Sequence, residues 1–249
     1  MTLPLEEARI QAILLDIEGT TTSIEFVYQT LFPYARQHVA EFLQQHFESP
    51  PVRDAVSQLR HECEADAREH PDCPPWRVET WQEEIQSAGA YCRWLIERDR
   101  KSTPLKSLQG MIWERGYQRG ELRGHVYPDV PAAFERWKRQ GKTISIFSSG
   151  SVLAQKLIFA HTELGDLTPF ITAYFDTMTG PKRDPESYKK IAAALDVPPG
   201  EILFLSDSVA ELNAARSVGM QTALSKRPEN PPTGPISHHV IRSFEEVLP

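Results

Sequence analysis

The sequence predicts an α/β fold with a doubly wound, mainly parallel sheet, and three observations lead to that class. Short apolar runs that end in small or acidic residues recur along the chain, which is typical of strands buried in a parallel sheet. Segments with helical spacing alternate with these runs, which indicates repeated βαβ units. Residues 24–125 carry aromatic and leucine residues at helical spacing with almost no strand-like run, which indicates a helical insertion after the first strand.

The strands of the predicted sheet follow one another along the chain with helices between them. The predicted strands are 12–16 (AILLD), 143–151 (TISIFSSGS), 171–176 (ITAYFD), 201–208 (EILFLSDS) and 221–225 (QTALS). The predicted helices of this part are 130–141, 152–161, 185–195 and 209–219. Pro185 opens one helix, and Gly141 and Gly219 close two others, in line with the preference for proline at helix starts and glycine after helix ends.

The chain is expected to divide into a catalytic core and a helical cap. The core comprises 1–23 and 126–249, and the cap comprises 24–125. Because the insert leaves after the first strand and returns before the second, it should lie over the carboxyl ends of the strands, where open α/β sheets bind ligands. The alternative is a packing domain without a part in catalysis. Residues 226–239 are expected to form an exposed loop in which His238 and His239 are solvated.

Composition excludes several classes of function. The chain has 249 residues, 40% of them hydrophobic, and its 27 Lys and Arg against 34 Asp and Glu give a net charge of -7 without a basic block. Binding to nucleic acid is therefore not expected. No apolar run approaches the roughly 20 residues that span a bilayer, so neither a membrane partner nor a location outside the cytoplasm is expected. Cys63, Cys73 and Cys92 do not form a CxxC pair and are expected to be reduced.

Two acidic residues stand where the first strand ends. In the stretch ILLDIEGTTTS, Asp16 follows the apolar run, Glu18 comes two residues later, and Gly19 permits a tight turn. Carboxylates this close repel each other and usually need a cation nearby. A turn or helix cap that uses Asp16 is the alternative for this stretch alone.

Polar residues also follow three later strands. Ser148 and Ser149 end the second strand just before a helix, where hydroxyl and N–H groups can hold a phosphate, although a plain serine N-cap is the simpler alternative. Lys182 follows the third strand and can neutralise a phosphate, whereas most loop lysines are only solvated. Asp207 ends the fourth strand with Glu211 one helical turn later, and such oxygen ligands suit Mg²⁺. Together these strand ends predict a phosphate-handling site.

The order of these motifs resembles that of the haloacid dehalogenase superfamily of phosphotransferases. The superfamily pattern is DxDGT, then a strand with Ser or Thr, then Lys, then an acidic strand end, and it places a cap domain after the first motif. Here the second acid is Glu18 rather than Asp. The strings LDIEGTTTSIEFV, GHVYPDV, IFSSGSVLAQKLIF and YFDTMTGPKRDPESYKKIA resemble, along essentially the whole chain, the enolase-phosphatases (acireductone synthases) of methionine salvage.

This resemblance implies an activity and a cofactor. The family enolises 2,3-diketo-5-methylthiopentyl-1-phosphate and then removes its phosphate, which yields the acireductone 1,2-dihydroxy-3-keto-5-methylthiopentene. It uses Mg²⁺, one per subunit, and its members are usually monomers. The partner implied here is therefore a small phosphate ester.

The resemblance also implies roles for individual residues. Asp16 is expected to be the nucleophile, Glu18 the acid and base, and Lys182 a further catalytic residue that binds substrate together with Ser148 and Ser149. The predicted metal ligands are Asp16, Asp207 and Glu18, the last through its backbone carbonyl.

Several alternatives remain open in the sequence. A carboxylate beside bound Mg²⁺ is a plausible base for enolisation, so Glu18 can serve both steps, but the motif does not identify the base. The aromatic residues Phe26, Tyr28 and Trp113 could form an apolar wall for the thioether, or could be core. A phosphatase without enolase activity would share the catalytic residues, and a non-enzymatic phosphate-binding module would not need Asp16.

Overall fold

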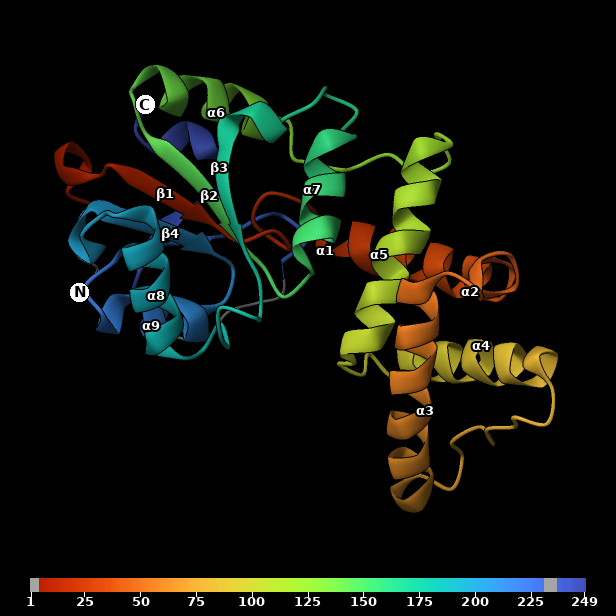
Figure 1. Ribbon diagram of the computed structural model, residues 1–249. Coiled ribbons are helices and arrows are strands. Elements are labelled where there is room, and N and C mark those ends of the chain that lie inside the picture. Colours follow the sequence, from red (N-terminus) through yellow and green to blue (C-terminus); the bar gives the residue numbers. More distant parts are fainter. Residues whose placement is uncertain (1–4, 231–236) are drawn as a thin grey trace. The chain divides into compact units, whose positions relative to one another are not determined.

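The computed structural model describes residues 5–230 and 237–249, and these form two compact units (Figure 1). The core unit comprises Met1–Val27 and Arg123–Pro249, and the helical unit comprises Tyr28–Leu122. Each unit has its own buried residues and is described by itself.

The core unit is built on a six-stranded sheet with the strand order β3-β2-β1-β4-β5-β6. The strands are β1 (Ala12–Leu15), β2 (Thr143–Phe147), β3 (Ile171–Phe175), β4 (Ile202–Ser206), β5 (Gln221–Ser225) and β6 (His239–Ile241). All of the described pairings are parallel, with Leu15 beside Ile146 on one neighbour and beside Leu205 on the other. The predicted α/β fold with a mainly parallel sheet is confirmed.

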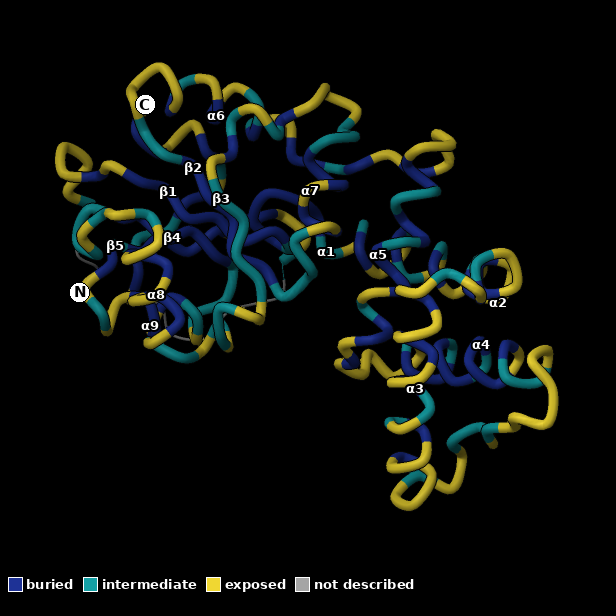
Figure 2. Tube along the Cα trace, in the orientation of Figure 1, coloured by how far each residue is buried: buried dark blue, intermediate teal, exposed yellow. Residues whose placement is uncertain are grey.

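Helices cover both faces of this sheet, which is why the central strands are apolar on both sides. The helices are α6 (Asp129–Arg139), α7 (Val152–Ala160), α8 (Pro185–Leu195) and α9 (Val209–Ser217). Leu14 and Phe204 pack in one cluster with Tyr188 of α8 and Leu212 of α9, and α6 lies on the opposite side of the sheet (Figure 1). Figure 2 shows the central strands as the most continuously buried part of the unit.

The helical unit contains no strand among its residues 28–122, all of which the structure describes. A short helix, α1 (Ile24–Phe26), and a π-helical turn (Val27–Leu31) lead into it. Its helices are α2 (Phe32–His46), α3 (Pro50–Glu69), α4 (Trp81–Glu97) and α5 (Thr103–Gln118). Their apolar faces share one core that includes Leu43, Leu59, Tyr91 and Leu108. The helical character predicted for this stretch is confirmed.

The tail of the chain differs from the prediction of an exposed loop. His239 begins β6, an edge strand whose three residues are too few to give a strand pattern in the sequence. His238 is buried, with its ring nitrogens against Thr222 Oγ1 at 2.8 Å and Asn213 Oδ1 at 3.0 Å. Arg227 is also buried. The part of the predicted loop from 231 to 236 lies outside the described residues.

In the described part of the chain, no helix combines the length and apolar character needed to cross a bilayer.

Candidate active site

Asp16 stands directly after β1 with a carboxylate fixed by its surroundings. The residue is 5% exposed. Its N–H donates to the Leu205 carbonyl at 3.0 Å, which extends the pairing of β1 and β4, and its Oδ1 accepts from Ile17 N–H at 2.7 Å. Ser206 Oγ donates to Asp16 Oδ2 at 2.9 Å. Both carboxylate oxygens therefore have a set direction at the carboxyl end of the central strand, where open α/β sheets bind ligands.

Lys182 joins two of the acidic residues at this edge. Its Nζ lies 2.7 Å from Asp16 Oδ1 and 2.7 Å from Glu211 Oε2, and its side chain is 11% exposed. Burial alone would lower the pKa of Lys182, but the Asp16 and Glu211 carboxylates raise it above its ordinary value. The lysine is therefore a cation at neutral pH, and it is held in place by Tyr188, whose hydroxyl donates to the Lys182 carbonyl at 2.6 Å.

The structure changes the role expected of Glu211. The sequence placed this residue one turn after Asp207 as a further acid for a cation, whereas the structure pairs it with Lys182. Ser206 Oγ lies 3.2 Å from Glu211 Oε2 as well as near Asp16, so one buried hydroxyl connects the two carboxylates. Ser206 had no signal in the sequence because a serine at the end of an apolar strand fits any strand end.

The carboxylates outnumber the cation that neutralises them. Burial, and then the charge of Asp16, raise the pKa of Asp207 to about 7, with a smaller contribution from the charge of Glu18 included in that value. The same two causes raise the pKa of Glu211 to about 7 despite Lys182 beside it. Groups of one sign that raise each other's pKa in this way favour a bound cation.

The loop that follows Asp16 leaves a small space beside Asp207. This space, bordered by Gly19, Asp207 and Asn230, is called the cradle below. Gly19 has φ +66°, and a Cβ built on it would stand 2.6 Å from Asp207 Oδ2 and 3.0 Å from Asn230 Oδ1. A side chain would fill this space, so glycine is needed for both its conformation and its size.

The donor set at the cradle suits Mg²⁺. No group of three or more His, Cys, Asp or Glu side chains in residues 5–230 and 237–249 is arranged to hold a metal ion. The predicted ligand set is Asp16, Asp207 and the Glu18 backbone carbonyl. It contains only two carboxylate side chains, so it differs from a site built from three or more such side chains. Mg²⁺ in phosphate-handling sites is commonly held by one or two carboxylates and completes its shell with water and phosphate oxygens. The residues therefore fit this ion, and their assignment as its ligands stays a prediction.

Carbonyl groups of the same loop are held by residues from distant parts of the chain. Asn230 Nδ2 donates to the Gly19 carbonyl at 2.9 Å, and Arg227 donates to the Thr20 carbonyl from Nε at 3.1 Å and from a terminal nitrogen at 2.9 Å. Tyr127 N–H donates to the Thr21 carbonyl at 3.0 Å. Arg227 also pairs with Asp129 at 2.8 Å. The sequence did not point to Arg227 or Asn230, which lie in the segment interpreted as an exposed loop.

Ser148 and Ser149 follow β2, the neighbour of β1 in the sheet. Ser148 is buried, its N–H donates to the Phe175 carbonyl at 3.1 Å, and its Oγ accepts from Gly150 N–H at 3.3 Å. The N-cap of α7 is Ser151, whose side chain accepts from Ala154 N–H. The capping function considered for this cluster therefore belongs to Ser151, and the phosphate contacts of Ser148 and Ser149 stay a prediction.

The aromatic residues considered for an apolar wall have different surroundings. Phe26 belongs to the core unit, with its ring centroid 5.9 Å from that of His125. Tyr28 is 47% exposed. Trp113 is 7% exposed, and its Nε1–H donates to the Leu31 carbonyl at 2.8 Å, which places it in the packing of the helical unit rather than on an open wall.

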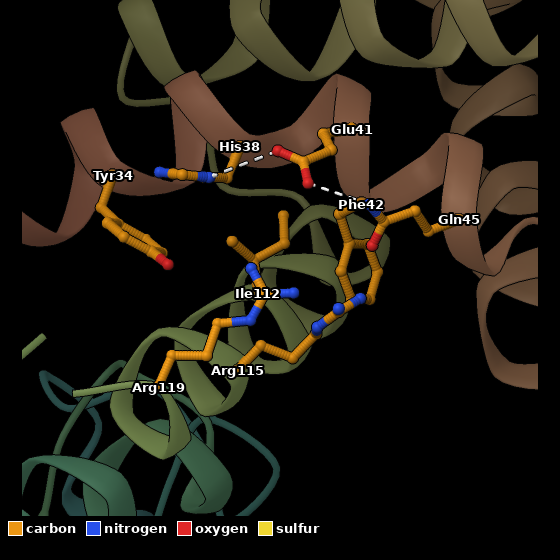
Figure 3. A pocket seen from close by; sticks show the side chains of 8 residues that line it. All are labelled: Tyr34, His38, Glu41, Phe42, Gln45, Ile112, Arg115 and Arg119. Carbon is orange, nitrogen blue, oxygen red and sulfur yellow. Dashed lines mark hydrogen bonds and ion pairs between the residues drawn. The ribbon is translucent and has the colours of Figure 1, made fainter. Parts of the chain in front are cut away.

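The helical unit has a small pocket of its own between α2 and α5 (Figure 3). In it Glu41 lies 4.0 Å from His38 and accepts from Gln45 Nε2 at 2.9 Å, while Arg115 and Arg119 reach the opposite side. Its acidic side chain already has partners on its own helix, and it contains none of the residues predicted to be catalytic. The candidate active site is therefore the region around Asp16, at the carboxyl ends of the strands of the core unit.

Comparison with known proteins identifies the family of the chain. The family model of the haloacid dehalogenase-like hydrolases matches residues 10–219. The protein named Enolase-phosphatase E1 in Synechococcus elongatus is 48% identical over 247 residues, which cover 99% of this chain and 100% of that protein. A protein of the same name in Drosophila melanogaster is 48% identical over 221 residues, which cover 88% of this chain and 84% of that protein.

A solved structure is similar over nearly the same length. The crystal structure of the UTR4 protein (Unknown transcript 4 protein) of Saccharomyces cerevisiae superposes with a TM-score of 0.76 at 35% identity, covering 95% of this chain and 99% of that one. The chain therefore belongs to the haloacid dehalogenase-like hydrolases and, among them, to the family of the Enolase-phosphatase E1 proteins.

Proposed function

We propose that this protein is a bifunctional enolase-phosphatase that converts 2,3-diketo-5-methylthiopentyl-1-phosphate to the acireductone 1,2-dihydroxy-3-keto-5-methylthiopentene and phosphate. The observation that carries the proposal is the fixed Asp16 carboxylate, with Lys182 Nζ 2.7 Å from it and the Glu18 charge close enough to raise the pKa of Asp207. Near full-length similarity to proteins named Enolase-phosphatase E1 supports the same reaction.

Asp16 is the nucleophile of the phosphatase step. A carboxylate oxygen of Asp16 forms a bond to phosphorus as the bond between phosphorus and the ester oxygen breaks, and the leaving oxygen takes a proton from Glu18. Water activated by Glu18 then hydrolyses the aspartyl-phosphate and restores Asp16. Lys182, Ser148 and Ser149 bind the phosphoryl oxygens, and Lys182 stabilises the negative charge that they share in the transition state.

Haloacid dehalogenase-like phosphatases generally use Mg²⁺, and one ion per chain is the proposed cofactor. Asp16, Asp207 and the Glu18 carbonyl would hold it. When bound it supplies positive charge next to the phosphoryl oxygens and the substrate carbonyl. The raised pKa of Asp207, to about 7, and the cradle beside Gly19 support this assignment.

Enolisation removes a proton from the carbon next to a substrate carbonyl, and Glu18 is the proposed base. Glu18 is partly exposed and lies just after the carboxyl end of β1, so it is accessible to a substrate bound there. The carboxylate holds the proton after abstraction and is then in the protonated form that the leaving oxygen requires. One residue would in this way serve both steps.

The remaining assignments follow the family. The helical unit, inserted in the chain between β1 and β2, is the proposed cap. The substrate is a small phosphate ester, and the protein is proposed to act as a monomer in the cytoplasm.

Glu18→Gln is expected to lower the rate of enolisation by about 10²–10⁴-fold, because glutamine has the size of glutamate and cannot accept the proton. Mg²⁺ should still bind, since the proposed ligand at this position is a backbone carbonyl. The measurement follows enediol absorbance and free phosphate from the diketo phosphate in one time course, with Mg²⁺ binding measured separately by calorimetry.

Glu25→Gln is the matched control for this variant. Glu25 is an exposed glutamate of the same segment, and its substitution should leave both signals unchanged. Normal enolisation by Glu18→Gln would show that another group is the base. If the wild-type protein releases phosphate but forms no enediol, it is a phosphatase of another small ester, which is the alternative function.

A further inference from the structure

We propose that Asn230 is a positioning residue of the metal site: its side-chain Oδ1 accepts a hydrogen bond from a water molecule bound to the cation, while its amide group holds the loop that contains Asp16 and Gly19. The inference rests on the Mg²⁺ site of the proposed function.

Two hydrogen bonds determine the orientation of the Asn230 amide. Its Nδ2 donates to the Gly19 carbonyl at 2.9 Å and to the Ser225 carbonyl at 3.2 Å. Both partners are carbonyl oxygens and can only accept, so the nitrogen must face them and the oxygen must face away. Since Ser225 is the last residue of β5, the amide ties the nucleophile loop to the sheet.

The oxygen that faces away is buried without a hydrogen-bond partner among the described residues. It lies 3.0 Å from the position that a Gly19 Cβ would take, and Asp207 Oδ2 lies 2.6 Å from the same position. The two oxygens therefore border the same small cradle. A buried amide oxygen that makes no hydrogen bond destabilises the folded chain, so native proteins usually provide a donor.

Neither of these oxygens can satisfy the other while Asp207 is ionised, because both are then acceptors. A cation held by Asp207 supplies the hydrogen-bond donor that Asn230 Oδ1 lacks. Mg²⁺ retains several of its water ligands in proteins, and those waters are strong donors. A bound water that donates to Asn230 Oδ1 would fix the orientation of the hydrated ion next to Asp207. Such outer contacts commonly change metal affinity 10- to 100-fold.

Holding the loop does not by itself require an asparagine oxygen. Arg227 fixes the next carbonyl, that of Thr20, through two donors and presents no acceptor. Arg227 therefore provides a matched comparison. Like Asn230, it clamps the nucleophile loop by donating to one of its carbonyls, but it has no acceptor oxygen at the cradle.

The test measures Mn²⁺ binding to the full chain by electron paramagnetic resonance of the free ion, a readout independent of turnover. Asn230→Leu removes the oxygen and is expected to raise the Kd about 10-fold or more. Asn230→Asp keeps an acceptor there and should bind Mn²⁺ at least as tightly as the wild type. Arg227→Lys, which keeps a charge for Asp129 but weakens the clamp, should lower the melting temperature and change the Kd less than about twofold.

The outcomes separate the claims. An unchanged Kd in Asn230→Leu overturns the inference, and so does an equal weakening by Asn230→Leu and Asn230→Asp, which would assign the effect to the amide clamp. Asn230→Ala replaces the leucine variant if that protein does not fold. Absence of Mn²⁺ binding by the wild type overturns the metal site of the proposed function together with this inference, whereas normal wild-type binding with unaffected variants overturns the inference alone.

Discussion

Asp16→Asn is expected to lower the rate of phosphate release by about 10⁴-fold or more, the largest effect of any single substitution in this site. The amide retains the shape of the carboxylate but cannot form the aspartyl-phosphate. The fold should survive, because Lys182 keeps Glu211 as a partner at 2.7 Å and Ser206 Oγ can still donate to the residue-16 side-chain oxygen. Phosphate release and the melting temperature are measured on the same preparation.

Asp54→Asn is the control for this substitution, because Asp54 is exposed on α3 and its main contact is with Gln58 one turn later. It should leave phosphate release unchanged. Phosphate release by Asp16→Asn near the wild-type rate, from a folded protein, would exclude Asp16 as the nucleophile. A role limited to binding a phosphorylated ligand predicts instead that Asp16→Asn binds the ligand as well as the wild type and that neither protein releases phosphate.

Lys182→Met is expected to reduce phosphate release by about 10²–10³-fold, the usual cost of losing one group that stabilises transition-state charge. Methionine fills the space of the lysine stem but leaves the phosphoryl oxygens and the Asp16 carboxylate without their cation. Lys189→Met provides the control, because Lys189 is exposed on α8 and pairs with Glu186 of its own helix. Wild-type kcat and KM in Lys182→Met would contradict the role assigned to this lysine.

The same substitution should also change how stability depends on pH. Burial and the Asp16 charge raise the pKa of Asp207 and of Glu211 to about 7, and Lys182 opposes both shifts. A carboxyl whose pKa is higher in the folded chain stabilises the fold below its unfolded pKa, and this contribution is lost as pH rises through the folded value.

Removing Lys182 raises the pKa values of Asp207 and Glu211 in the folded chain further. Their contribution to the free energy of unfolding is then lost over a range that extends to higher pH. We therefore expect the free energy of unfolding of Lys182→Met to lie further below that of the wild type at about pH 8.5 than at about pH 5.5. Urea unfolding in the presence of EDTA measures both margins. Equal margins would show that Lys182 does not neutralise these carboxylates.

The sequence was most informative where chemistry and strand pattern coincide. Asp16, Lys182 and Asp207 each follow an apolar run, and parallel strands bring such ends to one edge of the sheet. In the structure Lys182 Nζ lies 2.7 Å from Asp16 Oδ1, although Asp16 is 166 positions earlier in the chain. The helical insert was equally predictable, because helical spacing persists across it without a strand-like run.

Other parts of the site carried no signal in the sequence. Arg227 and Asn230 stand in a proline-rich segment, and only the folded chain shows their side chains reaching the Thr20 and Gly19 carbonyls. Ser206 looks like any small residue at a strand end. The edge strand β6 is three residues long, which is too short for an alternating pattern to appear. Long-range side-chain contacts and short edge strands depend on packing that local sequence does not encode.

The central claim is that one site performs both enolisation and phosphate removal. The most direct test supplies the purified wild-type protein with Mg²⁺ and 2,3-diketo-5-methylthiopentyl-1-phosphate and follows enediol absorbance and free phosphate in a single time course. We expect enediol to form first and phosphate to follow it. Both signals should be absent from a control reaction that contains the Asp16→Asn variant and EDTA. Phosphate released without any enolised product would contradict the claim and identify the protein as a phosphatase alone.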